Sequence, residues 1–441
     1  MDTSDIEDGQ EVDWKMHQIA FLCATEPEKT LNEIAKKLGI HPSTVGRKLR
    51  TATELGVFNK SYFPRSFQIQ KSVIDKLHNK LASTLSESLN EYLQILNCER
   101  TPENSLHCPQ IQIVCASDEF VLPNLTGQVE EIKQLERLHH DDQLIKFGRC
   151  CNQSVYSVFS NAIDIAQANE HEDTVVGVSW GRTLKSVTDF LQPETFADLQ
   201  KWSYKFVPLW GESIGREPDL EVTKFNNHAS LTPSSLAKSL GKILPGNSQV
   251  YSLNGVPVML PQSVQEHHRE AFEDYFSMIS DYKEIFGLKY DKAEKCPDER
   301  FANRLDVALI ALGSTKMPGR FLSPVLMKNY LDKGDTEKMQ SNILGDVGGV
   351  LMPKETSGQE YLDSFSKRWL GVTKDHLRNC AKRAVSRNGA GVCAFGTSRA
   401  KSDVALAGIQ NGLINNLICD LQLANGLLEL VKKSIKHHRS M

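Results

Sequence analysis

The sequence predicts an α/β protein in which a large domain, built on a mostly parallel and doubly wound sheet, follows a small helical domain. From about residue 110 onward, short apolar or β-branched runs alternate with amphipathic stretches. This alternation is typical of parallel strands covered by helices on both faces. A compact two-helix pattern spans Thr30 to Phe58. The 441 residues leave room for one small domain and one or two larger ones, each with its own core.

The segment from Thr30 to Phe58 predicts a helix-turn-helix. Gly39 suits the left-handed turn that ends a first helix, and Pro42 suits the first position of a second one. The apolar residues that point inward recur at helical spacing: Ile34, Ala35, Leu38, Val45 and Leu49. Residues 54–63 then indicate a helix end and a short apolar wing. We therefore expect a winged helix-turn-helix domain over residues 12–66.

The outward face of the second helix is polar and basic, which favours binding to double-stranded operator DNA. The start of this helix enters the major groove in such motifs. Between Lys29 and Arg65 the chain has eight basic side chains and two acidic ones, in a protein whose net charge is -4. Gly46 would let the backbone approach the DNA. The candidate DNA-binding residues are Ser43, Thr44, Arg47, Lys48 and Arg50. The alternative is an ordinary helical hairpin with a solvated basic face.

Residues 67–108 predict a helical connector. Leucine and valine recur every four residues from Val73 to Leu93. A step of four advances about 40° around a helix, so the row winds and does not form a straight heptad seam. Two interpretations are open, a contact between protomers and a helix of the protein's own core. Residues 98–108, with two prolines, indicate the boundary to the large domain at 109–441.

Composition favours a protein of the cytoplasm with no membrane partner. The sequence has no apolar run long enough to cross a bilayer, and its acidic start lacks the pattern of a signal peptide. Cys393 and Cys419 lie in apolar segments, where free thiols behave as small hydrophobic groups. The Cys150-Cys151 pair and the His139 to Asp142 run lack the spacing of a metal site. We expect no metal and no cofactor.

The large domain shows six candidate strands and five candidate helices. The strands fall at residues 175–178, 204–209, 249–253, 307–312, 391–395 and 417–419. The helices fall at residues 184–191, 234–240, 373–386, 400–410 and 421–433. Ligands of such sheets bind beyond the carboxyl ends of the strands.

Four of the loops that follow these strands carry glycine with serine, threonine or a cation. They begin at Ser179, Trp210, Gly313 and Gly396. Glycine lets backbone N–H groups approach an anion, and the start of a helix adds positive potential. Each loop alone is explained by the needs of folding. Together they favour a site for a phosphorylated or carboxylated small molecule, which includes Gly211 and Gly313.

Three runs of the sequence resemble the SorC-type sugar-responsive transcriptional regulators. They are GVSWGRTL at Gly177 to Leu184, NILGDVGGVLM at Asn342 to Met352, and the run from Gly396 to Leu428. The resemblance implies an effector domain related in fold to the sugar-phosphate isomerases, a phosphosugar effector, and a dimer or tetramer on DNA. It covers nearly the whole chain, which is longer than the family pattern around residues 98–140, 262–304 and 354–368.

The resemblance also implies the residues of the effector site. Gly181, Arg182 and Thr183 would cradle the phosphate or carboxylate of the effector, together with Gly396, Thr397 and Ser398. Asp346 would accept hydrogen bonds from sugar hydroxyls, and Lys401 would add positive charge at the anion. Asp420 suits either a contact with the ligand or the cap of the following helix.

Two other functions fit the same residues. In a phosphosugar isomerase, Glu212 or Asp346 would serve as the base, but the helix-turn-helix would have no role. A scaffold would bind DNA constitutively and respond to no metabolite. The sequence favours the regulator, with no catalytic residue.

Overall fold

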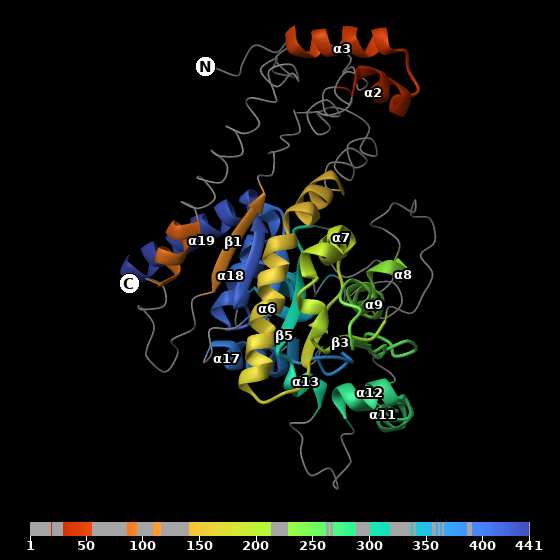
Figure 1. The fold of residues 1–441 in the computed structure, drawn as a ribbon. Coiled ribbons are helices and arrows are strands. Elements are labelled where there is room, and N and C mark those ends of the chain that lie inside the picture. The colour runs from red at the N-terminus through yellow and green to blue at the C-terminus, as the bar shows by residue number, and fades with distance from the viewer. Residues whose placement is uncertain are drawn as a thin grey trace. The chain divides into compact units, whose positions relative to one another are not determined.

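The computed structural model describes residues 30–54, 86–94, 109–115, 141–212, 228–261, 268–287, 300–317, 341–354, 366–385 and 390–440, with a few isolated positions between them. The chain divides into two compact units (Figure 1). One comprises residues 1–81 and 118–143, and the other comprises residues 82–117 and 144–441. Each unit is described by itself.

The first unit contains the predicted pair of helices, α2 (Leu31–Leu38) and α3 (Pro42–Glu54). Thr30 and Glu33 form a capping box at the start of α2, which satisfies backbone N–H groups that a helix leaves unpaired. Gly39 ends α2 with a φ of 62°. Of the predicted inward residues, Ile34, Ala35, Val45 and Leu49 are buried. The predicted wing lies outside the described residues.

The second unit is built on a nine-stranded sheet, which confirms the predicted α/β fold class. The strands follow the order β1-β9-β8-β5-β2-β3-β4, and every pair along this order is parallel. Their bounds are β1 Gln110–Cys115, β2 Thr174–Val178, β3 Tyr204–Pro208, β4 Gln249–Val250, β5 Val307–Ser314, β8 Gly391–Gly396 and β9 Asn416–Asp420. All six predicted strands are present.

Two features of the sheet differ from the prediction. The predicted strand at residues 249–253 is reduced to the two residues of β4, because the chain beyond Val250 leaves the sheet for isolated bridges and turns. An antiparallel hairpin, β6 (Ile343–Val347) and β7 (Val350–Pro353), pairs with the end of β5. Its two short apolar runs are joined by Gly348 and Gly349, whose positive φ angles of 59° and 95° suit the tight turn between antiparallel strands.

The helices cover both faces of the sheet, as a doubly wound sheet requires (Figure 1). On one face lie α6 (Asn152–Ala168), α7 (Arg182–Phe190) and α9 (Pro233–Ile243). On the other lie α13 (Phe301–Arg304), α17 (Lys374–Val385), α18 (Ser402–Gln410) and α19 (Leu421–Ser440). Shorter elements are η3 (Pro193–Phe196), η4 (Leu199–Lys201), α8 (His228–Leu231), α11 (Arg269–Ser277), α12 (Ser280–Phe286) and η6 (Arg399–Lys401).

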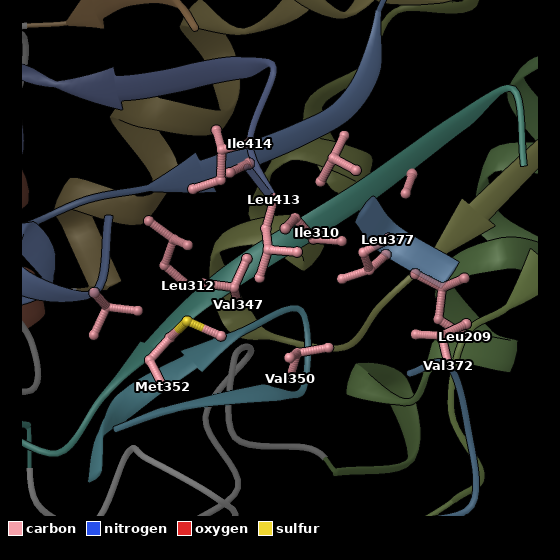
Figure 2. Packing of buried hydrophobic residues seen from close by; sticks show 14 of the residues in the cluster. Leu209, Ile310, Leu312, Val347, Val350, Met352, Val372, Leu377, Leu413 and Ile414 are labelled. Carbon is pink, nitrogen blue, oxygen red and sulfur yellow. The ribbon is translucent and has the colours of Figure 1, made fainter. Parts of the chain in front are cut away.

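Alternate residues of β5 enter the two cores. Leu309 packs with the helices of the first face, whereas Ile310 and Leu312 pack with the second. Figure 2 shows Ile310 and Leu312 beside Val347 of the hairpin. A strand buried on both faces needs apolar residues at every position, which explains the continuous apolar run of its sequence.

Part of the predicted connector belongs to the second unit. Residues 86–94 are helical, with Leu89 and Leu93 buried. The Ser86 hydroxyl donates to the Ile111 carbonyl at 2.5 Å, and the Lys432 ammonium lies 5.1 Å from the centre of the Tyr92 ring. This end of the connector is therefore a helix of the protein's own core. The boundaries predicted for the three domains stay a prediction.

The expectations about cysteines, metal ligands and membrane spans can be compared with the structure only within the described residues. Cys393 and Cys419 are buried thiols that form no disulfide within the described residues, as predicted. His139 and His140 lie outside the described residues. Among those described, no group of side chains has a metal-binding arrangement. Nor is any helix within the described ranges long and apolar enough to cross a membrane.

Candidate functional site

The predicted effector residues gather at the edge of the sheet where the parallel strands end. Lys401 of η6 crosses to the first turn of α7, where its ammonium donates to the Thr183 hydroxyl at 3.1 Å. Lys401 is only 7% exposed and Thr183 only 3%. An ammonium group so far from water requires compensating polar groups, and this one joins the loops after β2 and β8.

The loop after β2 has a conformation that needs glycine. Gly181 has a φ of 128°, and a Cβ atom there would lie 2.9 Å from the Cβ of Ala311. The Ser179 hydroxyl accepts a hydrogen bond from the Ala311 backbone N–H at 3.1 Å, which fixes the loop to β5. Arg182 is half-buried at the start of α7. The loop therefore presents the amino end of a helix to the sheet edge.

The loop after β8 is held in a strained conformation. Ser398 has a φ of 80°, a region that side chains other than glycine rarely adopt. Its backbone N–H donates to both carboxylate oxygens of Asp420, at 3.1 and 3.2 Å. Asp420 also accepts from the Leu423 N–H at 2.9 Å. The carboxylate thus caps α19 and fixes the loop at the same time.

Thr397 and Gly396 complete this loop. Thr397 is fully buried, and its hydroxyl oxygen has no hydrogen-bond partner in the part of the chain that the structure describes. A buried hydroxyl without a partner is costly, so the position needs a reason other than stability. A Cβ atom on Gly396 would lie 2.6 Å from the Leu423 side chain, so close packing requires this glycine.

Asp346 lies in β6, in register with Gly313 of β5. Its Oδ1 accepts from the Gly349 N–H at 2.7 Å, and the side chain is 3% exposed. Burial raises the pKa of Asp346 to about 6, although the Gly349 hydrogen bond and the Lys401 charge oppose that rise. The charge of Lys401 therefore acts on Asp346 as well as on the loop after β2. The Ser314 hydroxyl, beside Gly313, donates to the Ala400 carbonyl at 2.6 Å.

Gly211 has a packing role that its sequence did not indicate. A Cβ atom there would lie 2.3 Å from the Pro257 carbonyl oxygen, and the Gly211 N–H donates to the Leu370 carbonyl at 3.2 Å. That N–H is therefore already engaged. A ligand contact at Gly211 stays a prediction, as it does for the other residues of the site.

Sequence reasoning missed an aromatic cluster at the same edge. Trp180 and Trp210 each lie two residues beyond the end of a strand, β2 and β3 respectively, and Trp369 joins them from residues 366–373. Their ring centroids are 5.9 Å apart for Trp180 and Trp210, 6.0 Å for Trp180 and Trp369, and 5.2 Å for Trp210 and Trp369. The sequence could have indicated Trp180 and Trp210, because both follow predicted strands and therefore lie at the carboxyl edge of the sheet. No feature of the sequence placed Trp369 there.

The candidate DNA-binding residues lie on the outer face of α3. Ser43, Arg47 and Arg50 are exposed, whereas Thr44 and Lys48 are half-buried. The His41 ring nitrogen Nδ1 lies 2.8 Å from the Ser43 hydroxyl and accepts from the Ser43 N–H at 3.3 Å. A Cβ atom on Gly46 would meet nothing within 4 Å. Packing therefore does not require that glycine.

No family model and no curated protein matches the chain. Among solved structures, the full-length sorbitol operon regulator SorC from Klebsiella pneumoniae is 16% identical, with 95% of this chain and 100% of that chain covered and a TM-score of 0.46. A DeoR family transcriptional regulator from Listeria monocytogenes is 15% identical, with 79% and 99% covered and a TM-score of 0.44.

The similar solved structures are thus SorC- and DeoR-type regulators, as the sequence resemblance predicts. At these identities and scores the likeness assigns no function to this chain.

Proposed function

We propose that the protein is a DNA-binding transcriptional regulator of carbohydrate metabolism whose affinity for its operator depends on a phosphorylated sugar or similar anion. The helix-turn-helix binds the operator, and the effector binds at the carboxyl edge of the sheet. Two copies of a recognition helix are usual on a palindromic operator, so we expect a dimer or tetramer.

The observation that carries the effector site is the buried Lys401. Its ammonium reaches the Thr183 hydroxyl at 3.1 Å and its charge acts on Asp346, so one cation serves three segments of the edge. An anion placed between the loops after β2 and β8 would be stabilised by this charge and by the amino end of α7. Sugar hydroxyls would then donate to Asp346, whose Oδ1 alone is bonded among the described residues.

The operator site rests on the pattern of α3. Val45 and Leu49 fix its inner face, and Arg47 and Arg50 are exposed on the outer one. Exposed guanidinium groups bind phosphates and guanine edges. Effector and operator affect each other reciprocally, because any change that one causes in the affinity for the other applies in both directions.

Fluorescence anisotropy tests both halves of the proposal. A labelled duplex from the region adjoining the protein's own gene is titrated with the full chain, with and without each of a panel of sugar phosphates. We expect the protein to bind the duplex, and at least one sugar phosphate to weaken or strengthen that binding. Absence of binding at moderate salt would contradict the operator function.

A charge-matched pair of variants makes the DNA test specific. Arg47→Ala removes an exposed cation of α3, whereas Lys382→Ala removes an exposed cation of α17. We expect only the first to weaken binding, and to reduce the slope of log affinity against log salt by about 1 if Arg47 neutralises one phosphate. Equal effects would show that binding depends on overall charge.

The alternative function is a phosphosugar isomerase. It is favoured by one observation, the buried carboxyl of Asp346 whose pKa is raised to about 6, since a base of that strength suits proton transfer near neutral pH. Turnover of the same sugar phosphates followed by NMR decides between the two. Turnover by the wild-type protein that is lost in Asp346→Asn would favour the isomerase over the transcriptional regulator.

A further inference from the structure

Trp180, Trp210 and Trp369 form one aromatic cluster beside the proposed anion site, and we call them the tryptophan cluster. All three ring centroids lie within 6.0 Å of one another. Trp180 immediately precedes Gly181, the glycine of the loop after β2. Trp210 is 2% exposed, whereas Trp180 and Trp369 are only half-buried. The cluster therefore has a buried member and two members that keep exposed surface.

Trp210 is held rigidly by its surroundings. Its indole N–H donates to the Gly348 carbonyl. Cβ atoms on Gly349 and Gly371 would lie 2.4 and 2.3 Å from its ring, so the indole fills the space between two glycines. Any larger residue at either position would displace it. Trp210 thus supports the rings of Trp180 and Trp369, which pack on it at 5.9 and 5.2 Å.

The cluster connects to the polar side of the site through Gly349. The backbone N–H of this glycine donates to Asp346, and its Cα packs on Trp210. Gly349 therefore links the Asp346 carboxylate to the tryptophan cluster, while Lys401 acts on that carboxylate electrostatically. Apolar aromatic surface beside a carboxylate and a cation suits a ligand that has an apolar face, hydroxyls and an anionic group.

We propose that the exposed rings of Trp180 and Trp369 bind the face of a cyclic sugar, so that the effector is the ring form of a sugar phosphate. This inference rests on the proposed function. The face of an indole carries negative charge density, which attracts the weakly positive C–H groups on the face of a sugar ring. An open-chain polyol phosphate has the same anion and hydroxyls but presents no such face. The tryptophan cluster should therefore bind the cyclic form of a sugar phosphate more tightly than an open-chain form.

The test uses the full chain and measures intrinsic tryptophan fluorescence and calorimetric affinity. The probes are glucose 6-phosphate, fructose 6-phosphate and ribose 5-phosphate, each paired with its open-chain reduced form, together with methyl glucoside and inorganic phosphate. We expect at least one cyclic phosphate to quench the fluorescence and to bind at least 10-fold more tightly than its reduced form. In Trp369→Leu that preference should disappear, and in Trp369→Phe it should largely return.

The variants include a matched control from the opposite edge of the sheet. Trp202 precedes β3, and its indole N–H donates to the Thr174 hydroxyl at 2.7 Å. Trp202→Phe should leave the preference for the cyclic phosphate unchanged. Thermal unfolding identifies any variant that fails to fold. If Trp369→Leu does so, Trp180→Phe still tests the contact, by a smaller loss of affinity for the cyclic form alone.

The outcomes separate this inference from the proposed function. Equal binding of cyclic and reduced phosphates, unchanged in Trp369→Leu, overturns the role of the tryptophan cluster and leaves the anion site standing. Binding of methyl glucoside that Trp369→Leu abolishes, without any phosphate dependence, supports the cluster and overturns the anionic effector. No binding of any probe up to about 10 mM overturns both.

Discussion

The two edges of the sheet each bury an aspartate, and their surroundings differ. At the amino edge, just before β5, burial raises the pKa of Asp306 to about 6, against the effect of a backbone hydrogen bond and two arginines. At the carboxyl edge, burial raises the pKa of Asp346 to about 6 as well. A shifted pKa alone therefore does not distinguish a binding site from a structural network.

What distinguishes the edges is how their charged groups are arranged. Asp306 accepts from the Val175 N–H at 2.8 Å, and its other oxygen lies 3.6 Å from His171. Nearby, Asp173 pairs with both Arg304 and Lys205. This edge contains its own counter-charges.

The carboxyl edge is arranged differently. Thr397 has a buried hydroxyl with no partner among the described residues, which is rare in natural proteins. Lys401 is a buried cation that contacts Thr183 in the loop after β2 and whose charge acts on Asp346. The carboxyl edge is therefore the one to test for an anionic ligand.

The largest expected effect separates the two edges by charge. Lys401→Met should weaken binding of any phosphorylated effector by 100-fold or more, about 2.7 kcal/mol, because it removes a buried cation that joins the loops after β2 and β8. Lys205→Met removes a cation paired to Asp173 at 2.7 Å at the amino edge and should leave effector affinity unchanged. Calorimetric titration measures both. Similar losses in the two variants would show that long-range charge, and not the edge, determines binding.

Two threonines test the same difference by stability. Thr174 is fully buried at the amino edge and accepts from the Trp202 indole N–H at 2.7 Å, whereas Thr397 is equally buried without a partner. Thr174→Val should lower the free energy of unfolding by about 1 kcal/mol or more, since it leaves the indole N–H unpaired. Thr397→Val should raise it by about 1 kcal/mol and weaken effector binding. Denaturant unfolding with and without effector checks this, and a loss of stability in Thr397→Val would indicate a hydrogen bond that the hydroxyl makes within the protein.

The sequence predicted the parts of the fold that local pattern determines. Runs that are apolar at every position, such as residues 307–312, became strands buried on both faces, and Gly39 ended α2 as its position required. The hairpin of β6 and β7 was missed although Gly348 and Gly349, between two short apolar runs, favour a tight turn between strands. Its pairing with the end of β5 is a property of the whole fold, which local pattern does not determine.

The candidate site was predictable to a smaller degree. The loops after β2 and β8 could be placed at one edge, because parallel strands end together. Lys401 could be nominated by resemblance, but its contact with Thr183, 218 residues away in the sequence, could not be derived from spacing. The same is true of Trp369, which joins the cluster through tertiary packing. At Gly211 the structure adds a role that the sequence did not indicate, close packing against Pro257, and a ligand contact there stays a prediction.

The last expected effect is a difference in pH dependence. Asp346 and Asp306 both have a pKa of about 6 in the folded chain, above the ordinary value of 3.8. Between those two pH values the folded chain binds more protons than the unfolded chain, so the free energy of unfolding falls as pH rises. Each carboxyl contributes up to about 1.4 kcal/mol per pH unit to that fall. Asp346→Asn should remove the contribution of Asp346 to the slope, and Asp306→Asn should remove that of Asp306.

Bound effector should change only the contribution of Asp346 to the slope of unfolding free energy against pH. Hydroxyls that donate to its carboxylate favour the ionised form and lower the pKa, so saturating effector should flatten the wild-type slope toward that of Asp346→Asn. In Asp306→Asn the effector should cause the same flattening, because that variant retains Asp346. Denaturant unfolding at pH 4, 5 and 6 measures the slopes, and other titrating groups cancel when each variant is compared with wild type. If effector instead removed the contribution of Asp306 to the slope, the ligand would bind at the amino edge of the sheet and not at the carboxyl edge.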